Sequence, residues 1–291
     1  MSSCSQCKSK DNCSKNPESA NCNLLKVKYG NIKNVIGIIS GKGGVGKSTV
    51  TGILATKLRG EGYSVGVLDA DITGPSMPRF FGINEKRADI VPESLEQKDK
   101  FKFIPVVTRS GVVVNSLNLL TEKEEEPVIW RGPVINGVLN QMFCDTQWGD
   151  LDYLLIDMPP GTGDVALTVM QSMPIDGMVI VSTPQDLVSM IVKKVINMAK
   201  KLEISLLGVV ENMSYVTCKC GEKIKVFSDK DAEDSARELD LPLISEMPIN
   251  KNLTVHMEKG DIEEYILNYS EYNLILENFH KEFNKNKSIS K

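Results

Sequence analysis

The chain alternates short apolar runs with longer segments in which apolar residues recur every three or four positions. The apolar runs, predicted to be buried strands, cover residues 35–39, 63–69, 152–157, 177–185 and 206–213. The periodic segments, predicted to be helices, cover residues 50–58, 134–142, 186–202 and 229–240. Continuous apolar strands alternating with amphipathic helices are typical of an α/β fold. The pattern therefore predicts a doubly wound, mostly parallel sheet with helices on both faces.

Three weaker patterns complete the prediction. Residues 101–107 and 112–114 are predicted to form two strands of a hairpin, and residues 241–244 the last strand. Residues 265–283 are predicted to form one helix. We expect three parts: a cysteine-rich arm over residues 1–33, an α/β domain over 34–265, and a C-terminal helix and tail over 266–291.

A glycine-rich segment lies between the first predicted strand and the first predicted helix. It contains G-x-x-x-x-G-K-S from Gly41 to Ser48, and in this context the motif predicts a phosphate-binding loop. Backbone N–H groups and the helix dipole would attract phosphate, Lys47 would reach the β- and γ-phosphates, and Ser48 would ligate Mg²⁺. The alternative is an ordinary glycine-rich turn. The predicted nucleotide-binding residues are Gly41, Lys42, Gly43, Gly44, Val45, Gly46, Lys47, Ser48 and Thr49.

Three aspartates end predicted strands or follow them closely. Asp69 ends the second predicted strand and Asp71 follows it, and Asp157 ends an apolar strand in the Walker B pattern. Ligands of such sheets bind at the carboxyl ends of the strands, so these carboxylates are expected near the phosphates and a Mg²⁺ ion. Capping of a turn is the alternative for Asp69 and Asp71. Glycines in residues 158–164 suit a loop that orders around the γ-phosphate.

Lys42 is an additional lysine at the start of the loop, from which it could reach a nucleotide held by a facing subunit. With this lysine the sequence resembles the deviant P-loop ATPases, which include MinD, ParA, the nitrogenase iron protein and the Mrp/ApbC iron–sulfur carriers. The resemblance implies a nucleotide-sandwich homodimer in which Lys42 acts across the interface as a catalytic residue alongside Lys47.

Further segments resemble the Mrp/ApbC group in particular. They are D-A-D-I-T-G-P-S from Asp69, P-P-G-T-G-D from Pro159 and E-N-M-S from Glu211. The resemblance implies that Asp71 activates the attacking water and that Asp69 lies nearer the metal. It also implies that Asn212 contacts the base, and a turn-capping asparagine is the alternative.

Four of the seven cysteines lie in the polar N-terminal arm, as Cys4, Cys7, Cys13 and Cys22. The arm has too few apolar residues to form a core, and four thiolates could wrap an iron–sulfur cluster or a zinc ion. A redox role, or no role, is the remaining alternative. The arm resembles that of the eukaryotic cytosolic iron–sulfur scaffold ATPases. There the first ligand lies well upstream of C-x2-C, so Cys22 would have to serve as the fourth ligand here.

Cys218 and Cys220 form a second pair, just beyond Asn212. Two thiolates cannot complete a tetrahedral site, but the two cysteine pairs of a symmetric dimer can do so on the two-fold axis. The Mrp/ApbC resemblance implies a bridging 4Fe–4S cluster, although that group uses C-x2-C and this chain has C-x-C. A zinc-ribbon remnant or a redox pair are the alternatives.

Composition narrows the function classes. The 291 residues carry a net charge of −4, which does not favour general nucleic-acid binding. No apolar run is long enough to span a bilayer and the first residues lack a signal-peptide core, so a cytoplasmic location is expected. Lysines near the C-terminus are a weak membrane signal, and we expect no membrane binding.

The main hypothesis is an ATP-hydrolysing scaffold or carrier that delivers iron–sulfur clusters to apo acceptor proteins. Hydrolysis would be slow and coupled to cluster handling. One alternative is a MinD/ParA-like positioning ATPase with structural or zinc-bound cysteines. Another is a redox protein like the nitrogenase reductase.

Overall fold

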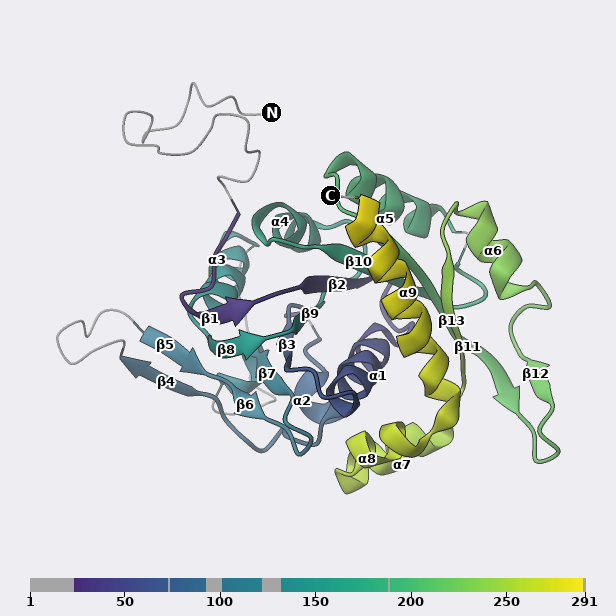
Figure 1. Ribbon diagram of the computed structural model, residues 1–291, viewed down its shortest axis with the longest axis horizontal. Helices are drawn as coiled ribbons and strands as arrows, with labels where there is room; N and C mark the ends of the chain where they lie inside the picture. The colour runs from purple at the N-terminus through teal and green to yellow at the C-terminus, as the bar shows by residue number, and fades with distance from the viewer. Residues whose placement is uncertain (1–23, 73, 93–100, 122–131, 188, 290–291) are drawn as a thin grey trace.

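The computed structural model describes residues 24–72, 74–92, 101–121, 132–187 and 189–289 (Figure 1). The four cysteines of the N-terminal arm lie outside these residues. Among the described helices, none has the length and apolar character needed to cross a membrane.

A nine-stranded sheet forms the centre of the molecule. Its strands run in the order β12 (Lys223–Lys225), β11 (Leu206–Thr217), β10 (Gly177–Ser182), β2 (Val35–Ser40), β9 (Tyr153–Asp157), β3 (Val65–Asp69), β7 (Val113–Ser116) and β6 (Val106–Val107). The ninth strand, β13 (Leu243–Pro248), pairs with β11. Only β12 and β6 run antiparallel to their neighbours. The predicted mostly parallel sheet is confirmed.

Alternate side chains of the central strands point to opposite faces of the sheet, so both faces are buried. Ile36 and Ile38 of β2 pack in one hydrophobic cluster, whereas Val35 and Ile39 pack in the other. The first face is covered by α1 (Lys47–Gly60), α2 (Met77–Phe80), α8 (Ile262–Asn268) and α9 (Asn273–Ile289). The second is covered by α3 (Gly132–Cys144), α4 (Asp164–Ser172), α5 (Met190–Lys201) and α6 (Ala232–Glu238). The predicted arrangement of helices on both faces is confirmed.

Two small sheets and three short helical segments complete the described structure. β1 (Tyr29–Ile32) pairs in parallel with β8 (Gln147–Leu151), and β4 (Asp89–Pro92) pairs antiparallel with β5 (Phe101–Ile104). The remaining segments are α7 (Lys251–Lys259), η3 (Leu117–Leu119) and η4 (Ser270–Tyr272).

The predicted bounds of the hairpin and of the last strand differ from the structure. The predicted hairpin is confirmed for β6 and β7, but β5 belongs to another sheet. Pro105 separates β5 from β6 and has no N–H to continue a ladder. The last strand begins at Leu243 rather than 241 and continues to Pro248.

The C-terminal helix expected over residues 265–283 is interrupted in the structure. α8 ends at Asn268 and α9 begins at Asn273. The buried Lys57 of α1 donates hydrogen bonds to the carbonyls of Leu267 and Tyr269 and to Asn273 Oδ1. It therefore satisfies acceptors that a helix end leaves unpaired. The same burial lowers the pKa of Lys57.

Gly52 allows α1 to approach α2 closely, which leads to a prediction about stability. A Cβ at Gly52 would lie 2.0 Å from Cε1 of the buried Phe80 ring. Displacing that ring costs about 1–3 kcal/mol, which exceeds the gain of about 1 kcal/mol from alanine in a helix. Gly52→Ala is therefore expected to lower the free energy of unfolding, measured by chemical denaturation.

The matched control is Gly137, which lies within α3 and whose added Cβ would meet no described atom within 4 Å. Gly137→Ala is expected to raise the free energy of unfolding by up to about 1 kcal/mol. Equal effects of the two substitutions would contradict this account of the α1–α2 contact.

Candidate nucleotide site and cysteine turn

The glycine-rich segment forms a loop between β2 and α1, as its motif predicted. Gly44 and Gly46 have φ values of 82° and 80°, which glycine adopts most readily. A Cβ on Gly46 would lie 2.1 Å from Asn212 Nδ2, so this position also requires glycine for space. Asn212 Nδ2 donates to the carbonyl of Val45 at 2.9 Å. The side chain predicted to contact the base therefore holds the loop itself in this structure.

Lys47 is the buried cation of the site, with 6% of its side chain exposed. Its Nζ lies 2.9 Å from Asp157 Oδ2 and 3.5 Å from Asp71 Oδ2. Neither contact has hydrogen-bond geometry, and no other described residue accepts a hydrogen bond from this nitrogen. The Lys47 ammonium therefore has N–H donors to offer a phosphate, and the residues present fit such a group.

Asp157, at the end of β9, is fully buried, and its carboxylate accepts hydrogen bonds from the start of α1. Ser48 Oγ donates to Asp157 Oδ2 at 2.5 Å, and Thr51 Oγ1 donates to Oδ1 at 2.8 Å. The Ser48 hydroxyl and the Asp157 carboxylate offer two adjacent hard oxygen atoms. Such a donor set fits Mg²⁺.

Asp69 lies beside Asp157, because β3 and β9 pair in register at these residues. Its carboxylate accepts hydrogen bonds from Ser116 Oγ, from the N–H of Met77 and from the N–H of Asp71. Burial, reinforced by the Asp157 charge, raises the pKa of Asp69 to about 7. Asp69 thus connects the end of β3 with α2 through Met77 and with β7 through Ser116.

Lys42, near the start of the loop, has about half of its side chain exposed. Its ammonium forms an ion pair with Asp186, which follows β10. Asp186 in turn accepts a hydrogen bond from Thr183 Oγ1 at 3.2 Å. The loop of residues 158–164, predicted to order around the γ-phosphate, also contacts this region. The N–H of Gly161 donates to the carbonyl of Ser40 at 2.7 Å. The Lys42 ammonium is thus paired with Asp186, while about half of the side chain remains exposed to solvent.

Strand β11 connects the phosphate loop with the second cysteine pair. Asn212 lies within it, and the strand ends at Thr217, directly before Cys218. Between them, Met213 has a φ of 57°. The pairing with β13 is irregular between Glu211 and Tyr215. One strand therefore reaches from the loop to the cysteines with a local kink on the way.

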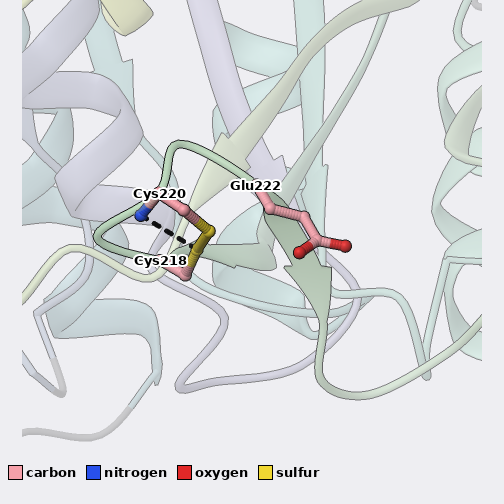
Figure 2. A group of neighbouring side chains, drawn as sticks. All are labelled: Cys218, Cys220 and Glu222. Atoms are coloured by element: carbon pink, nitrogen blue, oxygen red, sulfur yellow. Dashed lines mark hydrogen bonds between the residues drawn. A yellow bond between two sulfur atoms is a disulfide. The ribbon is translucent and has the colours of Figure 1, made fainter.

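Cys218 and Cys220 lie at an exposed turn between β11 and β12 (Figure 2). The structure joins their sulfur atoms in a disulfide, so binding of a metal here requires their reduction to thiols. Tyr215, Val216 and Thr217 pair with residues 223–225 across the hairpin. The described region has one other cysteine, Cys144, which is half-buried and whose thiol pKa is raised by burial.

The structure brings together most of the predicted nucleotide-site residues and adds several that the sequence analysis missed. Thr51, Ser116 and Asp186 each hold a predicted site residue in place. Thr51 could have been noticed as a polar residue one helical turn after Lys47. Ser116 and Asp186 carried no local signal, because only the folded sheet brings them to the site.

The fold and this loop define a P-loop NTPase of the MinD/ParA type. A family model described as "ParA: NUBPL iron-transfer P-loop NTPase" matches residues 31–283. An iron-sulfur cluster carrier protein of Clostridium perfringens is 62% identical over 282 residues, covering 95% of this chain and 99% of that protein. The chain therefore belongs to the NUBPL iron-transfer P-loop NTPase family, and the predicted resemblance to iron–sulfur carriers is confirmed.

Solved structures agree with this assignment. A nucleotide-binding protein of Archaeoglobus fulgidus in complex with ADP is 41% identical, with a TM-score of 0.70, covering 83% of this chain and 90% of that one. The cell division ATPase MinD of Pyrococcus furiosus has a TM-score of 0.58 at 21% identity, covering 87% and 99%. The second likeness concerns the fold alone. Together with the carrier relatives, these findings favour the carrier hypothesis over the positioning ATPase.

Proposed function

We propose that this chain is an ATP-hydrolysing carrier that holds an iron–sulfur cluster and passes it to apo acceptor proteins. The observation that carries the proposal is the course of β11. This strand leaves the phosphate loop at Asn212 and ends next to Cys218. A change at the loop can therefore reach the cysteines through a single strand.

In the proposed hydrolysis, Lys47 binds the β- and γ-phosphates through the N–H donors that its ion pairs leave available. Ser48 and Asp157 would hold Mg²⁺, which supplies positive charge beside the phosphates. Asp71 lies 3.5 Å from Lys47 Nζ and would orient the attacking water. Asp69 is buried and already accepts three hydrogen bonds. It would therefore support the metal site by holding nearby residues such as Asp71 in place, rather than by binding Mg²⁺ directly.

The proposed active unit is a homodimer. The Lys42 side chain is half exposed and pairs with Asp186 among the described residues, so we infer that it can reach a nucleotide bound by a second subunit. Its charge would stabilise the transition state of the partner's reaction. We infer slow hydrolysis, tied to binding and release of the cluster.

The cargo site would be formed by Cys218 and Cys220 of both subunits, four thiolates around one 4Fe–4S cluster. Exposure of the turn suits a site that must meet a second subunit and then an acceptor. Cys4, Cys7, Cys13 and Cys22 would form a second site for a cluster or zinc.

The test is anaerobic reconstitution with iron and sulfide after reduction of the disulfide. Iron content, thiolate-to-iron charge-transfer absorption and transfer to an apo 4Fe–4S enzyme are measured. Cys218→Ser/Cys220→Ser is expected to lose about four iron atoms per dimer and to stop transfer from this site. Cys144→Ser is the control, because Cys144 lies apart from the turn in the sequence and is half-buried. Unchanged iron content and transfer in the double variant would refute the proposal.

A further inference from the structure

The cysteine turn contains a third side chain suited to binding a metal, which the sequence analysis did not use. Glu222 directly precedes β12, and Figure 2 shows it next to the two cysteines with its side chain extending away from the disulfide. One oxygen of Glu222 and the sulfur atoms of Cys218 and Cys220 all lie within 4.8 Å of one another. No other group of three histidine, cysteine or acidic side chains in the described residues comes this close together.

Backbone hydrogen bonds hold these three residues on one compact turn. The N–H of Cys218 donates to the carbonyl of Glu222 at 2.9 Å, and the N–H of Gly221 donates to the carbonyl of Cys218 at 3.0 Å. Gly221 has a φ of 88°, which lets the chain reverse between the second cysteine and the glutamate. The turn itself therefore brings the backbone of the three residues together without a partner subunit.

The turn also provides a donor to one of the sulfur atoms. The N–H of Cys220 points to Cys218 Sγ at 3.2 Å. Hydrogen bonds of this kind orient the side chains that bind a metal, so this N–H would help to fix the position of the Cys218 sulfur.

We propose that the reduced turn of each subunit binds one divalent transition-metal ion through Cys218, Cys220 and Glu222. Two thiolates and a carboxylate suit Zn²⁺, Fe²⁺ or Co²⁺. Ligand atoms of a tetrahedral site of this kind lie about 3.5–3.8 Å apart. Rotation of the exposed Glu222 side chain can close the present separation, and reduction lets the sulfur atoms move apart.

Three protein ligands leave the fourth position of the metal open. In zinc proteins, sites with four protein ligands are structural, whereas sites with three protein ligands hold an exchangeable water or substrate in the fourth position. An open position would let an incoming thiolate take over the metal. Use of the site to load iron, one atom per subunit, rests on the proposed carrier function, whereas metal binding by the turn does not.

The experiment uses the full chain with serine at the four arm positions, Cys4, Cys7, Cys13 and Cys22. Excess dithiothreitol, a dithiol, reduces the Cys218–Cys220 disulfide by two electrons and two protons and itself becomes a cyclic disulfide. After anaerobic desalting, Co²⁺ is titrated and the thiolate-to-cobalt charge-transfer absorption is recorded. We expect one Co²⁺ per chain, no such band without reduction, and at least about tenfold weaker binding in Glu222→Gln.

Asp229→Asn is the matched control, because it removes the same charge from an exposed residue further along the chain. Its Co²⁺ affinity is expected to stay within about twofold of the parent, since Asp229 is not part of the ligand group and exposed charges are screened by salt. Equal affinity of Glu222→Gln and the parent, equal loss in both acid variants, or no cobalt band after reduction would each overturn the proposal. Failure of cluster transfer would refute the proposed function and leave this titration unaffected.

Discussion

Replacing Lys47 by methionine is expected to abolish measurable nucleotide binding and to lower ATP hydrolysis at least about 100-fold. Lys47 is the buried ammonium between Asp157 and Asp71, and methionine has similar length but no charge. Without that charge, the phosphates of ATP would face two carboxylates with no side-chain cation at this position. Binding is measured by calorimetry with an ATP analogue, and hydrolysis by phosphate release.

The same substitution removes a charge from a buried ion pair, so folding has to be checked separately. Breaking such a pair costs about 3–5 kcal/mol. Asp157 keeps hydrogen bonds from Ser48 and Thr51, which limits the loss. Lys200→Met is the control, since Lys200 is exposed on α5. A Lys47→Met protein that is folded by circular dichroism and still binds ATP normally would contradict the proposed site.

Mixing two impaired variants, Lys42→Ala and Asp71→Asn, is expected to restore part of the hydrolysis if Lys42 acts across a dimer. Lys42→Ala is expected to bind ATP with little change, because Lys42 is half exposed, but to hydrolyse it at least about tenfold more slowly. Asp71→Asn is expected to bind ATP but not to position the water. In a mixed dimer, one of the two sites has both an intact Asp71 and the partner's Lys42.

The expected recovery is about a quarter of wild-type activity, because half of the dimers are mixed and each of those has one of two sites intact. Phosphate release is measured before and after mixing at equal total concentration. Lys42→Ala mixed with itself serves as the control. No recovery on mixing, with mixed dimers shown to form by differential tagging, would place the action of Lys42 within its own subunit.

The sequence predicted those parts of the structure that depend on local patterns. The phosphate loop was predictable because its glycines and Lys47 must stand at fixed offsets between a strand and a helix. The fold class was predictable because buried strands and amphipathic helices alternate. The carboxyl ends of parallel strands share one edge, and this placed Asp69 and Asp157 near each other before their register was known.

Features that depend on residues distant in the chain could not be predicted. The break between α8 and α9 is accompanied by contacts from Lys57, which lies 216 residues before Asn273. The ion pair of Lys42 with Asp186 likewise joins two loops that only the sheet order brings together. The hydrogen bond from Asn212 to the carbonyl of Val45 was also not predictable, because it joins residues 167 positions apart.

The hairpin of β11 and β12 determines where the sequence around the two cysteines can change without disturbing the central sheet. Thr217 pairs with Lys223, so residues 218–222 form a tip that is closed by the hairpin's own ladder. An insertion or deletion within this tip would leave the register of the central sheet unchanged, because β12 lies at its edge. The spacing of the cysteines and the identity of neighbouring ligands can therefore change by small genetic steps. The hairpin tip is thus a module whose sequence can change while the central sheet and the phosphate loop stay constant.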